Sequence, residues 1–414
     1  MKKQHLILGL LLACFQLASA QFTLEGEFRP RSEYFGNGGN FTGGSFPAQT
    51  AVKGDEGFVR TTVRAALKAT YATEAYKVHI NFQEVFAFGD RQQISTAGNG
   101  NFRVQEAWAD LKLGEFSTLK LGRQQLSYDD QRILGGLGWA QQARTHDAAV
   151  FKYKKDGYNL DIGASLNTTT DEVYNNVTLF TYRDMVFMRA NKKFDKLNFS
   201  ALALVNTFQN GTALSPAGSN KATLITAGLH AGYKTGALGL STNLFLQEGN
   251  RMVGSYQDVS GAYLASLDAT LKASDKVTLL AGIESISGAQ DDSAGFFPLF
   301  GTNHKFNGLI DRFYVGNHAN ANGLVDINFG AKFALPKGYN LTAKFHNFSE
   351  ESGDGNALGN ELDLVVAKGF KGYKLVGGYS HFFEPDTAPA NAKDTQNWAW
   401  LMLVIKPKFL NGLK

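Results

Sequence analysis

Arginine side chains stand out among the residues that could do chemistry, because they recur at even spacings within short segments. Arg60 and Arg64 share one face of the segment 58–70, and apolar residues occupy the other face. Arg183 and Arg189 repeat this pattern in the segment 183–192. A guanidinium group presents a planar fork of N–H donors that matches carboxylates and phosphates. The spacing therefore predicts a surface that attracts anionic solutes.

The same alternation places Arg29 on such a face in the first segment, and most arginines precede residue 190. One wall of the protein should therefore be rich in arginine. The alternative interpretation is that these arginines pair with neighbouring acids and only hold the structure open. The acids available for that role are Glu25, Glu27, Glu84, Glu106, Asp161 and Asp184.

Alternation of polar and apolar residues indicates what positions these side chains. In the segment 157–168, Leu160 and Ile162 share one face, whereas Asn159 and Asp161 share the other. The pattern recurs at 236–247, 263–271 and 325–335. Segments of about ten residues with this period are typical of a transmembrane β-barrel. A water-soluble β-sandwich shows similar alternation, so the connections must decide between the two.

Short and long connections alternate strictly along the chain. The short ones lie at 71–75, 114–115, 154–157, 195–196, 235–236, 274–276, 336–338 and 371–372. The long polar ones lie near 34–57, 89–101, 127–145, 168–178, 208–221, 249–261, 288–322, 349–359 and 384–396. This alternation predicts an all-β fold, a closed antiparallel transmembrane β-barrel of about eighteen strands with short periplasmic turns and long external loops.

The first twenty residues resemble a secretory leader. Lys2 and Lys3 precede an apolar core that ends at the small residues 18–20, which predicts a signal peptide cleaved after Ala20. Residues 21–414 then form a single barrel domain in the outer membrane of a Gram-negative bacterium. The alternative is a lipoprotein signal acylated at Cys14. No later apolar stretch is long enough for a membrane-spanning helix, and the net charge of +4 gives no indication of a nucleic-acid partner.

Two segments carry a resemblance to a known family. The first, at 122–153, contains Gly122, Arg123, Gln124, Tyr128, Asp130, Gln131, Arg132, Trp139, Arg144, Asp147 and Ala148. The second, at 296–314, contains Thr302, Asn303, His304, Lys305, Phe306 and Asp311. In these positions the chain is similar to the alginate-export family of outer-membrane barrels. Asp129 and His146 depart from the family pattern, which more often has a small residue and an aromatic residue there.

The resemblance implies an anion-conducting pore in which inward arginines line a path for a uronate polymer. The predicted pore-lining set is Arg29, Arg60, Arg64, Arg123, Arg132, Arg144, Asp147, Arg183 and Arg189. The predicted loop motif is Tyr128, Asp130, Gln131, Trp139, Asn303, His304, Lys305 and Asp311. The expected partners are outer-membrane lipid and lipopolysaccharide, an anionic or sugar-like solute, and periplasmic export machinery, with no cofactor. A monomer and a trimer both remain open.

Three function classes follow from these residues: a channel for anionic solutes, a general non-selective porin, and a barrel enzyme or adhesin that acts through its external loops. Ser380 and His381 are adjacent in a predicted strand, so their side chains point to opposite faces and cannot form a catalytic dyad. Asp354, with Glu350 and Glu351 nearby, is a weak candidate for calcium binding. The segment lacks the regular ligand spacing of a calcium loop, which favours a solvated acidic loop.

Overall fold

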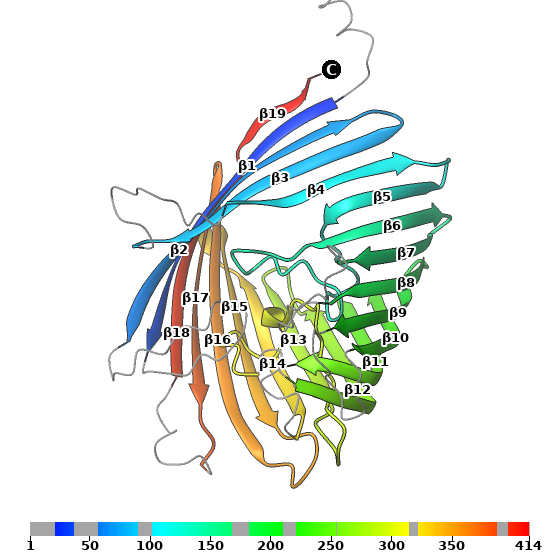
Figure 1. Ribbon diagram of the computed structural model, residues 1–414. Coiled ribbons are helices and arrows are strands. Elements are labelled where there is room, and N and C mark those ends of the chain that lie inside the picture. The colour runs from blue at the N-terminus through cyan, green and yellow to red at the C-terminus, as the bar shows by residue number, and fades with distance from the viewer. Residues whose placement is uncertain are drawn as a thin grey trace, which may run out of the picture.

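The computed structural model describes residues 21–36, 57–89, 102–167, 182–209, 221–253, 255–313, 322–386 and 396–413. The predicted leader at 1–20 lies outside these residues. The described chain forms one closed antiparallel β-barrel of 18 strands (Figure 1). It is divided into 19 strand segments because Pro407 interrupts the last strand. Proline has no backbone N–H group, so it cannot continue the hydrogen-bonded ladder.

The strand segments vary in length, and the longest hairpin is formed by β11 and β12. The bounds are β1 (Gln21–Gly36), β2 (Phe58–Ala72), β3 (Tyr76–Ala87), β4 (Arg103–Lys112), β5 (Ser117–Gln124), β6 (His146–Lys155), β7 (Tyr158–Leu166), β8 (Asp184–Lys193), β9 (Leu197–Gln209), β10 (Lys221–Thr235), β11 (Leu238–Val253), β12 (Ser255–Lys272), β13 (Val277–Ile286), β14 (Leu324–Ala334), β15 (Tyr339–Ser349), β16 (Ala357–Phe370), β17 (Tyr373–Phe383), β18 (Gln396–Ile405) and β19 (Lys408–Leu413). Two short 3₁₀ helices are η1 (Asn303–Lys305) and η2 (Pro336–Gly338).

The barrel closes where the first strand meets the last. β1 pairs with β2 on one side, and with β18 and β19 on the other. In this seam Tyr34 lies opposite Ala399, and Glu25 lies opposite Lys408. A sheet in hydrocarbon must pair every backbone amide, so it cannot keep a free edge. The pairing confirms the predicted closed barrel.

The two faces of the sheet are the reverse of a water-soluble fold. Along β7, Ile162 and Leu166 are 42% and 66% exposed, whereas Asp161 and Ser165 are buried. Apolar side chains therefore point outward and polar side chains point into the lumen, as the alternation predicts. Within the described residues, no helix is both long enough and apolar enough to cross a bilayer.

Short turns lie at one end of the barrel, called here the turn end, and longer connections at the other, called the loop end. This arrangement confirms the predicted alternation, with one correction. The polar segment 249–261 is not a loop, because β11 runs to Val253 and β12 begins at Ser255. The ladder passes a bulge at Gly249, whose φ of 107° suits glycine, and continues beyond it.

Candidate functional site

Two of the long connections fold into the lumen and contact each other. Loop A is residues 125–145, between β5 and β6, and loop B is the described residues 287–313 and 322–323 of the connection between β13 and β14. Gly135 N donates to Phe300 O at 2.8 Å, and Thr302 N donates to Gln131 O at 2.9 Å. Thr302 Oγ1 also accepts from Leu137 N at 3.1 Å. The two segments that carry the family resemblance are therefore joined in space.

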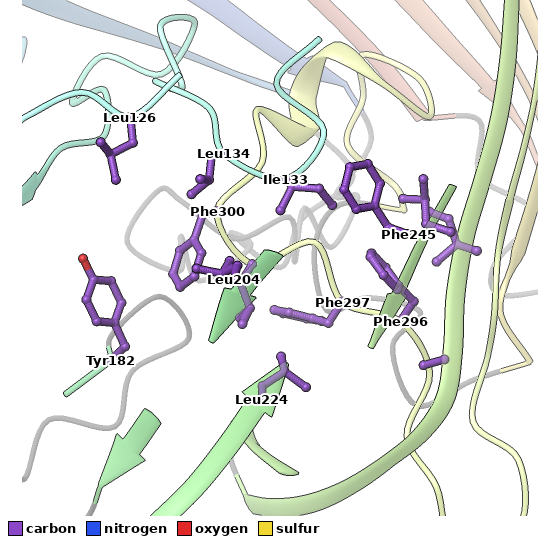
Figure 2. Close-up of a cluster of buried hydrophobic side chains, with 14 of the residues drawn as sticks. Leu126, Ile133, Leu134, Tyr182, Leu204, Leu224, Phe245, Phe296, Phe297 and Phe300 are labelled. Atoms are coloured by element: carbon purple, nitrogen blue, oxygen red, sulfur yellow. The ribbon is translucent and has the colours of Figure 1, made fainter. Parts of the chain in front are cut away.

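An apolar cluster fixes both loops inside the barrel. Figure 2 shows Leu134 of loop A beside Phe300 of loop B, with Leu204 of β9 and Leu224 of β10 below them. Phe296 and Phe297 of loop B are fully buried in the same cluster. Burying aromatic and aliphatic side chains removes apolar surface from water, which holds a loop of this length in place.

The wall formed by β1 to β4 holds the tip of loop A through arginine forks. Arg29 donates to Gly138 O at 2.8 Å, to Ala140 O at 3.0 Å and to the Gln141 side chain at 3.0 Å. Arg64 donates to the carbonyl groups of Ala140 and Gln141, and Arg103 donates to the carbonyl of Gln142. The side chain of Gln141 in turn donates to Arg29 O at 3.2 Å and to Thr62 Oγ1 at 3.1 Å.

The start of loop A is held by the opposite wall. Arg189 of β8 contacts Asp129 at 2.6 Å, and Asn243 of β11 donates to Asp130 Oδ2 at 2.8 Å. Arg132 pairs with Glu284 of β13 at 2.7 Å, and both side chains are buried. Loop A therefore spans the lumen from the β1–β4 wall to the β8–β13 wall, and it narrows the passage.

Carboxylates of the barrel wall hold loop B. Glu284 accepts from Asn307 Nδ2 at 2.7 Å, and Glu361 accepts from Ile310 N at 2.8 Å. Asp363 accepts from Leu309 N at 3.2 Å. Because Glu284 contacts both Arg132 and Asn307, it joins loop A, loop B and the wall at one point.

Aromatic rings close the seam from the inside. Trp139 of loop A stacks on His304 of loop B with ring centroids 4.7 Å apart, and it meets Trp400 of β18 edge-on at 4.6 Å. The Arg31 guanidinium lies over the Trp139 ring at 4.4 Å. His304 Nδ1 lies 2.8 Å from a carboxylate oxygen of Asp311. The imidazole ring is thus held between a carboxylate and the indole ring.

Burial changes the acid–base properties of two loop residues. It lowers the pKa of Lys305, whose ammonium group donates to Asp130 O at 2.9 Å. It raises the pKa of Tyr128, with further contributions from Asp161 and Asp129, so the phenol stays protonated over the physiological range. The loops therefore present a lysine that loses its charge more easily than a surface lysine and a neutral phenol.

The remaining predicted pore residues differ in their surroundings. Arg60 points inward opposite Glu33 and makes no hydrogen bond or ion pair with any described residue. Arg144 donates to Gly301 O at 2.8 Å and so links loop A to loop B. Arg183 pairs with the neighbouring Asp184 at 3.4 Å.

Two predicted pore residues face the wrong way for that role. Arg123 and Asp147 are partners in the ladder and form a bidentate ion pair at 2.7 and 2.8 Å. They share the outward face of β5 and β6 with Leu121, which is 38% exposed. The expectation that they line the pore is therefore corrected, because side chains two positions apart in a strand lie on the same face.

No group of three or more His, Cys, Asp or Glu side chains in the described part of the chain could hold a metal ion, and Asp354 belongs to no such group. The Glu350 carboxylate accepts from Asn322 Nδ2 at 3.0 Å and from Asn356 Nδ2 at 2.8 Å. These hydrogen bonds from Asn322 and Asn356 lower the pKa of Glu350. The acidic loop is thus ordered by amide donors.

The sequence analysis missed the wall carboxylates Glu284, Glu361 and Asp363, which hold loop B. A signal was present, because each lies on the inward face of its strand by alternation. It also missed Gln141, whose role depends on contacts with residues about a hundred positions away. Taken together, the site is a constriction in which buried arginines on one wall and buried acids on the other hold two loops inside the lumen.

Residues 46–401 of the chain match the protein family described as alginate export. A search of curated proteins finds no match.

Solved outer-membrane structures share the fold at low sequence identity. The outer membrane protein OpdK from Pseudomonas aeruginosa is 12% identical with a TM-score of 0.60, covering 93% of this chain and 99% of OpdK. A BenF-like porin from Pseudomonas fluorescens Pf-5 is 12% identical with a TM-score of 0.62, covering 94% and 99%. A further structure of Pseudomonas aeruginosa OpdK contains vanillate, at 11% identity, a TM-score of 0.61, and coverage of 93% and 99%.

Proposed function

The chain belongs to the alginate export family, whose members are outer-membrane channels, and from this membership we propose that it conducts anionic solutes, with carboxylate-bearing saccharides as its substrate class. The turn end then faces the periplasm and the loop end faces the exterior. The same proposal includes removal of residues 1–20 on export.

The observation that supports anion selectivity is the nature of the arginines' partners. Arg29, Arg64 and Arg103 donate mainly to backbone carbonyls of loop A, which carry no net charge. Their positive charges are therefore only partly neutralised, because one carboxylate, Glu27, is shared among Arg29 at 3.9 Å, Arg64 at 3.4 Å and Lys68 at 3.1 Å. A narrow passage with low-dielectric walls strengthens the field of such fixed charges. Anions should therefore be favoured at the constriction.

The acids of the opposite wall support the competing hypothesis, which is a general porin with little ion selectivity. Glu284, Glu361 and Asp363 are engaged by loop B and Arg132. If their charges offset the arginines, the pore is a general porin with little preference between ions. The vanillate bound to OpdK, an aromatic carboxylate, is compatible with the anion-selective proposal.

Reversal potential in a planar bilayer with a salt gradient tests the proposal. We expect the wild-type protein to prefer chloride over potassium, and the preference should fall in Arg60→Gln. Arg60 has no hydrogen bond or ion pair with described residues, so removing its charge should leave both loops in place. Arg123→Gln is the matched control on the outward face. A cation-selective wild-type channel would refute the proposal, and a nearly neutral one would favour the general porin.

A further inference from the structure

Lysine side chains line the half of the lumen nearest the turn end, called here the turn half. The ladder places the following lysines on the inward face there: Lys68, Lys77, Lys112, Lys120, Lys152, Lys154, Lys193, Lys234, Lys272, Lys332, Lys344 and Lys374. Lys120 illustrates the assignment, because it lies between the outward Leu119 and Leu121 and opposite the fully buried Val150.

Acids on this part of the inward face are fewer, and several already have partners. Among the described residues they are Glu25, Glu27, Glu106, Asp110, Asp161, Asp268 and Asp363, and Glu27 pairs with Lys68 at 3.1 Å. Asp161 pairs with Lys152 at 3.4 Å, and Glu106 accepts from the Trp108 indole at 3.2 Å. By contrast, Lys77, Lys112, Lys154, Lys193, Lys234, Lys332, Lys344 and Lys374 make no ion pair with described residues. This half of the lumen therefore carries a net positive charge.

Among the described residues, the exposed rim of the loop end is rich in acids. Its exposed acids include Glu248, Asp258, Asp291, Asp292, Asp354 and Asp386. Most of the described arginines lie on the loop-end half or in the loops, where their forks hold carbonyls and carboxylates. Although the net charge of the chain is only +4, positive charge therefore gathers in the turn half of the lumen and negative charge on the described rim of the loop end. Such a field draws anions to the turn end and repels them from the loop end.

A hollow in the lumen wall lies within this lysine-lined half. It has a volume of about 520 Å³ and lies at the turn ends of β8 to β12, where polar groups of Asn198, Ser241 and Thr270 line it. Its charged lining residues are three lysines, Lys193, Lys196 and Lys234, and two acids, Asp195 and Asp268, so the ammonium groups outnumber the carboxylates. Gly232 and Gly239 leave it open, and a Cβ atom at Gly232 would meet no atom within 4 Å. The hollow thus offers ammonium groups for a carboxylate and hydroxyl and amide groups for sugar hydroxyls.

We propose that this hollow is a loading site, which binds one carboxylated sugar unit of a polyanion that enters from the periplasm. The proposal rests on the proposed function and adds a site and an entry side to it. Lysine suits this role, because its hydrated ammonium group on a flexible stem forms contacts that exchange easily along a moving chain. The arginine forks at the constriction come next on the path towards the exterior.

Single-channel recording with a soluble alginate oligosaccharide tests the loading site. The only cysteine of the sequence is Cys14, so Ser274→Cys in a turn, probed with an impermeant thiol reagent, identifies the side that the turn end faces. We expect blocking events to be about tenfold more frequent when the oligosaccharide is added on the turn side. A neutral dextran oligosaccharide of equal length should produce no such asymmetry.

Two variants and a control distinguish binding in the hollow from the effect of the overall positive charge of the protein. The double variant K193Q/K234Q should abolish the asymmetry, and Gly232→Leu should shorten the blocked times by filling the hollow at unchanged charge. The control K155Q/K192Q removes the same charge from the outward face and should leave the asymmetry intact. Equal block from both sides, or equal effects of the two lysine pairs, overturns the loading site. An anion-selective channel with symmetric block refutes this site alone, whereas a cation-selective channel refutes the proposed function as well.

Discussion

Replacing Arg132 by alanine should release loop A from the β13 wall. Arg132 pairs with Glu284 at 2.7 Å, with side chains 5% and 3% exposed, and its guanidinium lies over the Phe306 ring at 3.3 Å. The substitution leaves the Glu284 carboxylate buried with only Asn307 as a donor. Removing one partner of a buried ion pair typically costs about 3–5 kcal/mol, because the remaining charge is no longer compensated.

That cost falls on the inward-folded state of the loops and not on the barrel wall, whose ladder is unchanged. A difference of about 1.4 kcal/mol is a factor of ten in an equilibrium constant, so the ratio of detached to inward-folded loop should rise by roughly two to three and a half orders of magnitude. We expect frequent steps between the wild-type conductance and a higher level. The double variant R132M/E284L should restore quiet recordings, since an apolar pair of similar volume replaces the ion pair without a buried charge.

Single-channel recording and limited proteolysis of loop A measure this effect. The detached loop should be cleaved in the Arg132→Ala variant and protected in the double variant. Recordings of Arg132→Ala that are as quiet as those of the wild type would contradict this prediction, and so would a double variant that is as noisy as the single one.

Three further predictions concern individual side chains. Trp139→Ala removes the stacking on His304 and should raise the conductance and its noise in bilayer recordings, because the tip of loop A loses its aromatic partners. Asp147→Asn breaks the outward ion pair with Arg123 and should leave ion selectivity unchanged, although the free energy of unfolding in detergent should fall by no more than about 1 kcal/mol. Burial lowers the pKa of Lys305, so this side chain should lose its charge at a lower pH than surface lysines do. The wild type should therefore prefer anions more strongly than Lys305→Gln at neutral pH, and this difference should disappear as the pH rises. A difference that persists at strongly alkaline pH would contradict this prediction.

Most of the wall could be predicted from the sequence, since a strand in a barrel exposes alternate residues to lipid and water. The pattern in β7 and the positions of the short turns follow from local chemistry alone. The same rule places Arg60 and Arg64 on the inward face. The segment 249–261 was predicted wrongly because its polar residues indicate a loop, whereas strands that extend beyond the bilayer need no apolar face.

The site was less predictable, for two different reasons. Arg123 shares the parity of Leu119 and Leu121, so its outward position could have been inferred, but the motif around it suggested a pore role. The path of loop A could not be inferred in this way. Its contacts, such as those of Arg29 with Gly138, join residues 109 positions apart and depend on the closed barrel.

The position of Trp139 has a mechanical consequence. This ring contacts Arg31 on the first strand and Trp400 on the last. Loop A therefore crosses the joint where the first and last strands of the sheet pair, and it connects the two strands from inside the barrel. Lateral tension on that joint must separate the indole rings as well as the backbone ladder. A variant that enlarges the aperture by withdrawing loop A should therefore also loosen the joint, so in this protein permeability and resistance to lateral opening change together.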